Sequence, residues 1–134
     1  MKFKYIKLLL LIVVVGMLQC RKADIKLGIY NVALNDCSGH LAEPYICFDS
    51  LVTDSRCPKG VNCVWQGTAQ IKVNFHEGGN SHRFDMSLQN FPSLGITSDT
   101  IINGYRIRFE DLLPYPDFDT NPSTKKVAVI SVTQ

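Results

Sequence analysis

The sequence lacks any block of like charge that would indicate a nucleic-acid-binding surface. Lysine and arginine total 14 against 12 aspartate and glutamate residues, and both signs are scattered along the chain. Three of the lysines, Lys2, Lys4 and Lys7, belong to the extreme N-terminus. Without them 11 basic residues face 12 acidic ones, so the formal charge changes from +2 to −1. The sequence therefore predicts no nucleic-acid partner.

Signatures of catalysis and of metal binding are also missing. No Gly-x-Ser-x-Gly elbow, glycine-rich phosphate loop or Cys-x-x-Cys pair occurs. The histidines His40, His76 and His82 are scattered, and we expect them at the solvated surface. The oxygen-rich stretch Asp117–Asn121 lacks the full spacing of a calcium loop and is interpreted as a polar turn. We therefore predict a protein that is not an enzyme and has no metal or other cofactor.

One long apolar run occurs, and it lies near the N-terminus. A basic segment precedes Leu8–Leu18, which is almost wholly apolar, and Gln19 and Cys20 follow. This order is typical of a secretory signal, and the run is short for a membrane span, which needs about 20 residues. The cysteine that closes the run resembles the lipobox of bacterial lipoproteins, although Gln19 stands where a small residue is usual. We predict a signal peptide over residues 1–19 and lipidation of Cys20.

Lipidation of Cys20 would attach the protein to a membrane of the bacterial cell envelope through its N-terminus. Residues 20–24 would form a tether, and residues 25–134 a single domain. The basic pair Arg21-Lys22 is unlike the acidic segments that direct some lipoproteins to the cell surface. We therefore expect a periplasm-facing protein.

Four further cysteines remain after Cys20, an even number in a chain that is predicted to be exported. Export favours disulfides, and four cysteines allow three pairings. We favour the pairs Cys37–Cys47 and Cys57–Cys63, because both enclose short loops between predicted strands. Each bridge would stabilise the fold by about 2–3 kcal/mol in the chain-entropy model.

The remainder of the chain shows strand and turn signals and no sustained helical period. The clearest alternation runs from Trp65 to His76, with Trp65, Ala69 and every second residue to Phe75 on one face. The Asn103-Gly104 pair predicts a tight hairpin turn. We expect an all-β, antiparallel β-sandwich of about seven strands, immunoglobulin-like, with a small β-barrel as the alternative. The predicted strands are 26–32, 45–48, 65–76, 82–88, 100–102, 105–111 and 126–132.

The segment that contains Cys57 and Cys63 is interpreted as a structural staple. Pro58 and Gly60 turn the chain between the two cysteines, and a bridge would fix that turn. We expect Trp65 to cover the disulfide from the core side. A metal-binding or redox loop is the alternative, but zinc sites favour Cys-x₂₋₄-Cys spacing and redox pairs favour Cys-x-x-Cys.

Two charged residues beside this staple carry expectations of their own. We expect Asp54 to accept hydrogen bonds from backbone N–H groups of the loop, as aspartates before turns commonly do. We expect Arg56 to pair with a carboxylate.

The pattern D-S-R-C-P-x-G-V-x-C-V-W-x-G, residues 54–67, resembles the signature of small exported lipoproteins of the Bacteroidetes type. The segment Pro114-Tyr115-Pro116, which follows the strand containing Gly104-Tyr105-Arg106-Ile107, is also similar. The resemblance covers about residues 45–134 and implies location and fold rather than a particular chemistry. Tyr115 between its two prolines is either an exposed recognition aromatic or a core residue at a strand end.

The function predicted from these features is a non-enzymatic binding or structural role at the cell envelope, with loops at one end of the sandwich as the recognition surface. An inhibitor of envelope or secreted proteases is the alternative. It is suggested by the small size of the domain, the stapled loop and the Pro-Tyr-Pro segment.

Overall fold

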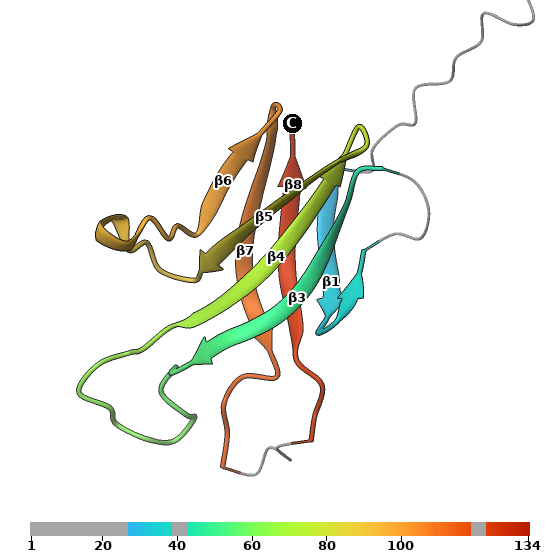
Figure 1. The fold of residues 1–134 in the computed structure, drawn as a ribbon. Helices are drawn as coiled ribbons and strands as arrows, with labels where there is room; N and C mark the ends of the chain where they lie inside the picture. The colour runs from blue at the N-terminus through green and yellow to red at the C-terminus, as the bar shows by residue number, and fades with distance from the viewer. Residues whose placement is uncertain (1–26, 39–42, 119–122) are drawn as a thin grey trace, which may run out of the picture.

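The computed structural model describes residues 27–38, 43–118 and 123–134. The predicted signal peptide, Cys20 and the predicted tether lie outside these residues, as do His40 and part of Asp117–Asn121. The described domain consists of two β-sheets (Figure 1). Its elements are β1 (Gly28–Ala33), β2 (Asp36–Cys37), β3 (Tyr45–Asp54), β4 (Ala69–Glu77), β5 (Asn80–Ser87), a 3₁₀ turn (Pro92–Leu94), β6 (Asp99–Ile102), β7 (Tyr105–Leu113) and β8 (Val127–Thr133).

Each sheet contains four antiparallel strands, in the orders β1-β8-β7-β6 and β2-β3-β4-β5. The second sheet is a meander in which each strand pairs with the next one in the chain. The first sheet is completed when β1 pairs with the last strand, β8. The expected antiparallel β-sandwich is therefore confirmed, and the barrel alternative is wrong because the two sheets stay separate. The additional strand, β2, has two residues and is too short to produce a pattern in the sequence.

The hydrophobic core lies between the two sheets and follows from the period of two along the strands. In β7, Tyr105, Ile107 and Phe109 are buried, while the residues between them are exposed. Burial of each large apolar side chain stabilises the fold by about 1.5–3 kcal/mol. The largest fully buried side chains are Ile46, Phe48, Ile71, Phe75, Met86, Ile107, Phe109, Leu112 and Ile130.

Two hairpins have the turns that the sequence predicts. The β6–β7 turn contains Asn103 with φ 50° and Gly104 with φ 86°. The β4–β5 turn contains Gly78 with φ 56° and Gly79 with φ 78°. Positive φ at both central residues matches the twist of the flanking strands, so both turns hold their hairpins in register.

Strand β3 is longer than the predicted segment 45–48 and ends at Asp54. Its pairing with β4 shifts register between Phe48 and Ser50 and again between Leu51 and Thr53. Each such bulge moves the following side chains to the opposite face. The alternation is therefore lost in the sequence although the strand continues.

The two ends of the sandwich are built differently. Gly28 at the start of β1 pairs with Val132 near the end of β8, so both termini of the described domain share one end (Figure 1). At the opposite end β3 passes into β4, and β7 passes toward β8. We call this opposite end the loop end. It comprises the β3–β4 loop (55–68), residues 88–91 after β5 and residues 114–118 after β7.

Candidate functional site

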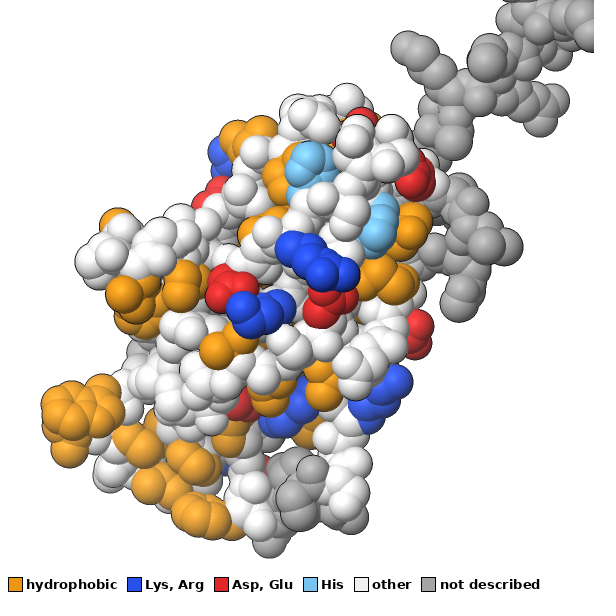
Figure 2. Space-filling view, in the orientation of Figure 1, with side chains coloured by type: hydrophobic (Ala, Val, Ile, Leu, Met, Phe, Trp, Pro, Cys, Tyr) orange, Lys and Arg blue, Asp and Glu red, His pale blue; other side chains and the backbone are white. Residues whose placement is uncertain are grey.

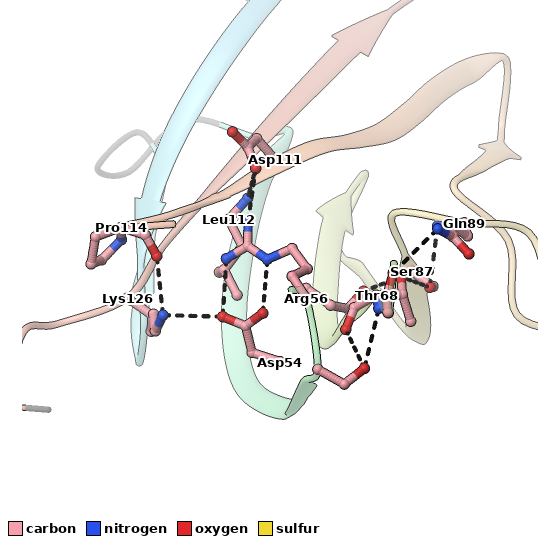
Figure 3. A network of polar contacts seen from close by, with 12 residues as sticks. Asp54, Arg56, Thr68, Ser87, Gln89, Asp111, Leu112, Pro114 and Lys126 are labelled. Atoms are coloured by element: carbon pink, nitrogen blue, oxygen red, sulfur yellow. Dashed lines mark hydrogen bonds and ion pairs between the residues drawn. The ribbon is translucent and has the colours of Figure 1, made fainter. Parts of the chain in front are cut away.

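Four charged side chains connect the two sheets at the loop end. Arg56 donates two hydrogen bonds to Asp54, with Nε–Oδ1 at 2.7 Å and Nη2–Oδ2 at 3.0 Å. Its Nη1 reaches Asp111 Oδ1, on β7 of the other sheet, at 3.1 Å (Figure 3). Lys126, directly before β8, donates to Asp54 Oδ2 and to the Pro114 carbonyl, both at 3.1 Å. The row Lys126–Asp54–Arg56–Asp111 alternates in sign, and we call it the charge ladder.

The interior of the charge ladder is buried, since Arg56 is only 6% exposed. A buried charge is costly unless it is paired and hydrogen-bonded, and the two carboxylates meet that need. The expected pairing of Arg56 with a carboxylate is confirmed. The expectation that Asp54 accepts from the loop backbone is wrong, because its oxygens accept from the Arg56 and Lys126 side chains and the loop N–H groups donate elsewhere. One example is Cys57 N–H, which donates to the Gln66 carbonyl at 3.0 Å.

The electrostatic balance of the charge ladder favours an ionised Asp54. Burial by itself would raise the pKa of this carboxyl group. Hydrogen bonds from Arg56 and Lys126, together with the attraction of their positive charges, outweigh burial and hold the pKa of Asp54 below its ordinary value. Asp54 is therefore a permanent anion near neutral pH.

The Pro-Tyr-Pro segment covers the charge ladder. The Arg56 guanidinium carbon lies 4.6 Å from the centroid of the Tyr115 ring, a cation–π contact. The Pro114 carbonyl accepts a hydrogen bond from Lys126 of the ladder, and the Pro116 carbonyl accepts the N–H of Lys59 at 3.1 Å. Tyr115 is half-buried, between the two alternatives that the sequence leaves open. The segment thus links β7 to the β3–β4 loop.

Both predicted disulfides are present. Cys37–Cys47 joins facing positions of β2 and β3. Cys57–Cys63 closes a turn within the β3–β4 loop, with a Cα–Cα distance of 5.9 Å. Because the sulfurs are bonded to each other, they offer no thiolate to a metal ion. Within residues 27–38, 43–118 and 123–134, no group of three or more His, Cys, Asp or Glu side chains is placed to hold one.

Trp65 points into solvent, and the expectation that it covers the disulfide from the core side is wrong. It is 80% exposed and lies in the loop before β4, which begins at Ala69. Gly67 stands between them with φ 64°, and a Cβ at this position would overlap the Ser55 carbonyl oxygen. This left-handed residue interrupts the extended backbone, so the alternation that starts at Ala69 does not continue back to Trp65.

Three apolar side chains between residues 61 and 65 of the β3–β4 loop are exposed. Val61, Val64 and Trp65 are 38%, 89% and 80% exposed, and we call them the apolar tip. Figure 2 shows apolar side chains gathered at the lower left of the molecule, where Figure 1 places this loop. Single exposed apolar residues are ordinary on protein surfaces, but a group of them indicates an interaction site. Phe118, which follows β7, is a further exposed aromatic at 79%.

Hydrogen bonds order the base of the loop that carries the apolar tip. Ser55 and Thr68 at the base of the loop exchange backbone and side-chain hydrogen bonds of 2.9–3.1 Å. Gln89 after β5 donates from Nε2 to the Gly67 carbonyl at 3.2 Å. Such a loop loses little conformational entropy when a partner binds, because its backbone is already ordered.

A cavity of about 230 Å³ opens beside the charge ladder. Its volume is below the 300–1,000 Å³ or so that is typical of drug-sized ligands, so it suits one side chain or a small group. Its wall combines polar groups with a comparable amount of apolar surface. The residues that line it include Arg56, Gln66, Leu88, Gln89, Asp111 and Tyr115.

Sequence reasoning missed Asp111 as a partner of Arg56 and Lys126 as a partner of Asp54. A signal for Asp111 exists in the sequence. The alternation of Ile107 and Phe109 would place residue 111 in the core, yet residue 111 is an aspartate and the next buried residue is Leu112. This break in the alternation corresponds to a register shift between Phe109 and Asp111 in the pairing of β7 with β8. A β-bulge redirects side chains, so a carboxylate at this position is a candidate for an ion pair outside the regular strand pairing.

The described histidines lie on strands of the second sheet. His76 on β4 stacks on Tyr45 of β3, with ring centroids 4.4 Å apart, and His82 lies on β5. Both are half-buried rather than fully solvated. The expectation of solvated histidines is therefore corrected for these two, because their strand positions place the rings against neighbouring strands.

These features define a disulfide-bonded β-sandwich domain with a stapled loop at one end. Two disulfides indicate an oxidising compartment outside the cytosol. In the described part of the chain, no helix has the length and apolarity needed to span a membrane. No family model, curated protein or solved structure matches the chain.

Proposed function

We propose that the protein is a lipid-anchored module of the bacterial cell envelope that binds a protein partner through the apolar tip. The observation that carries this proposal is the exposure of Val61, Val64 and Trp65 on a loop fixed by Cys57–Cys63. Protein interfaces are enriched in tryptophan and other apolar side chains at their centres. A partner that covers this tip gains the free energy of its burial without first ordering the loop.

A photocrosslinker placed in the apolar tip tests the binding role. We would incorporate p-benzoylphenylalanine at Val64, 89% exposed, and as a control at Ile101 on β6, 63% exposed. Irradiation of intact cells should give a discrete adduct from position 64 and none from position 101. Adding Trp65→Ala to the crosslinker variant at position 64 should abolish the adduct. Equal labelling from both positions, or an adduct unaffected by Trp65→Ala, would contradict a site at the tip.

The anchor in this proposal is a lipid on Cys20. It is supported by the position of this cysteine directly after the apolar run and by the lipobox-like order of the residues before it. Cys20→Ala should move the protein from the membrane fraction to the soluble fraction and remove incorporation of a fatty-acid probe. Unchanged membrane retention with no lipid label in the wild type would overturn it. Protection from added protease in intact cells would support a periplasm-facing position.

Inhibition of proteases is a second candidate function, favoured by the geometry of the same loop. Val61-Asn62-Cys63-Val64-Trp65 is exposed and is tied at Cys63 to Cys57, so it can present an ordered segment to a cleft. Inhibitory loops rely on such pre-ordering. A panel of serine and cysteine proteases tested at micromolar protein should show inhibition that Trp65→Ala weakens. No inhibition across the panel would remove this candidate.

A further inference from the structure

The charge ladder ends in a carboxylate oxygen that is not used within the domain. Asp111 Oδ1 accepts from Arg56 Nη1 at 3.1 Å and from the N–H of Leu112 at 2.7 Å. Among the residues that the structure describes, Oδ2 of Asp111 has no hydrogen-bond or ion-pair partner. The Asp111 side chain is 46% exposed, and Figure 3 shows its second oxygen turned away from Arg56. One end of the ladder is therefore open to an additional contact.

Comparison of the two carboxylates shows what kind of group Asp111 can still bind. Asp54 is shared by two cations, because Arg56 binds it from one side and Lys126 from the other. Asp111 has a cation on one side only. The two cations of the ladder balance its two aspartates, and the open oxygen of Asp111 remains an anionic acceptor that suits a positive donor group.

The cavity beside Asp111 offers further groups to such an occupant. Gln89 uses its Nε2 to hold the Gly67 carbonyl, which leaves Oε1 as an acceptor, and the Tyr115 ring forms another part of the wall. Figure 3 shows Asp111 and Gln89 on opposite sides of the Arg56 side chain. An occupant that uses both groups must be long, with a cation at one end. A carboxylate-bearing occupant would instead meet the negative charge of Asp111.

We propose that this cavity receives a lysine or arginine side chain from the protein partner, with its ammonium or guanidinium group on Asp111. The inference rests on the proposed function and makes it more specific. The apolar tip and the cavity share one loop, since Trp65 and Gln66 are consecutive. The partner segment therefore carries a basic residue close to apolar residues. Its apolar part covers the tip while its basic part completes the charge ladder.

Small probes test the cavity without a partner. Isotope-labelled protein would be titrated with the N-methylamides of acetyl-lysine and acetyl-arginine, followed by backbone amide NMR. The matched controls are the same derivatives of leucine and glutamate. We expect saturable shifts near Asp111, Tyr115 and Gln89 with the two basic probes at millimolar concentration, weakening as salt is added. No saturable shift with either basic probe, or equal shifts with the glutamate probe, would overturn the proposal.

Variants separate the cavity from the rest of the loop end. Asp111→Asn should weaken binding of the basic probes about ten-fold, because it removes the charge and keeps the shape. Asp99→Asn, on β6 and outside the residues that line the cavity, is the control and should leave binding unchanged. Gln89→Leu lies outside the charge ladder and should also weaken binding, so the test does not depend on Asp111→Asn folding normally. Binding that both cavity variants leave unchanged would refute the site.

The two proposals fail in different ways in this experiment. Trp65→Ala should leave binding of the basic probes intact while it abolishes the crosslink at position 64. Probe binding without a crosslink would keep the cavity and remove the partner site at the tip. A crosslink without probe binding would keep the tip and remove the basic occupant.

Discussion

Lys126 and Asp54 lie 72 residues apart in the chain, yet Nζ of the lysine is 3.1 Å from Oδ2 of the aspartate. The contact fastens the segment before β8 to the end of β3 in the opposite sheet. Arg56 adds a second connection between the sheets through Asp111. At the loop end, ionic contacts therefore join the two sheets, whereas apolar packing joins them in the core.

Removal of the buried cation should destabilise the fold strongly. Arg56→Met leaves Asp111 without a cation and Asp54 with Lys126 alone, and we expect a loss of about 3 kcal/mol in the free energy of unfolding. Urea denaturation followed by circular dichroism would measure it. Arg83→Met is the control, because that side chain is 78% exposed and its ion-pair distance to Asp49 is 3.8 Å. The control should change stability by less than about 0.5 kcal/mol, and equal effects of the two variants would contradict the assigned role.

Stability should depend on pH through Asp54. The pKa of this carboxyl is lower in the folded chain than in the unfolded chain, so its ionisation favours folding. The contribution is complete above the unfolded pKa of about 3.9 and is lost as the pH falls through the folded pKa. Asp54→Asn should be less stable than the wild type at pH 7, with the difference narrowing below about pH 4. Urea midpoints across this range would test it, and a constant difference would argue against ionisation as the cause.

A pair of glycine variants isolates the tight backbone approach at Gly67. Gly67 and Gly60 both have positive φ, 64° and 77°, so alanine is strained at either position by about 1–2 kcal/mol. A Cβ at Gly60 meets nothing within 4 Å, whereas one at Gly67 overlaps the Ser55 carbonyl. Gly67→Ala should therefore lower the free energy of unfolding by about 2 kcal/mol more than Gly60→Ala. Similar losses would mean that the loop shifts to make room.

The staple in the β3–β4 loop should contribute a modest and measurable stabilisation. Cys57 and Cys63 are six residues apart, so the chain-entropy model gives about 2 kcal/mol for this bridge. Replacement of both cysteines by serine should lower the thermal midpoint accordingly. Serine at both Cys37 and Cys47, which are 10 residues apart, should cost slightly more, about 3 kcal/mol. An unchanged midpoint for the first pair would show that hydrogen bonds alone order the loop.

Trp65 should be dispensable for folding. It is 80% exposed, so Trp65→Ala should change the free energy of unfolding by less than about 0.5 kcal/mol. Phe75→Ala in the core is the contrast and should cost about 3–5 kcal/mol. Because the chain has a single tryptophan, the wild-type emission reports on this side chain alone. It should resemble that of free tryptophan and be quenched readily by acrylamide, and a blue-shifted, protected emission would contradict the exposed position.

The parts of the fold that sequence reasoning predicted are those where neighbouring residues decide the structure. The β4–β5 and β6–β7 hairpins follow from alternation and from turns such as Asn103-Gly104, which act over a few residues. Both disulfide pairings could be predicted for the same reason, because each encloses a short loop. The end of β3 was hidden by two bulges that break its alternation.

The candidate site was predicted less well, because long-range contacts build it. Arg56 carried a signal as a charge within a stapled loop, but its partner Asp111 is 55 residues away. The alternation also suggested a buried Trp65, since one left-handed glycine at Gly67 is enough to separate loop from strand. Local patterns do not contain the register between sheets, so the cavity and the ladder required the folded chain.

Because the chain enters the sandwich at the end opposite the loop end, the domain would act as a spacer between the proposed anchor and the proposed partner. Strand β3 alone has 10 residues, which corresponds to about 33 Å of extended backbone between the two ends. The start of β1 at Gly28 and the exposed Trp65 therefore lie about one strand length apart. With the proposed anchor in place, a molecule bound at Trp65 would be held away from the membrane by a distance set by the length of the sheets.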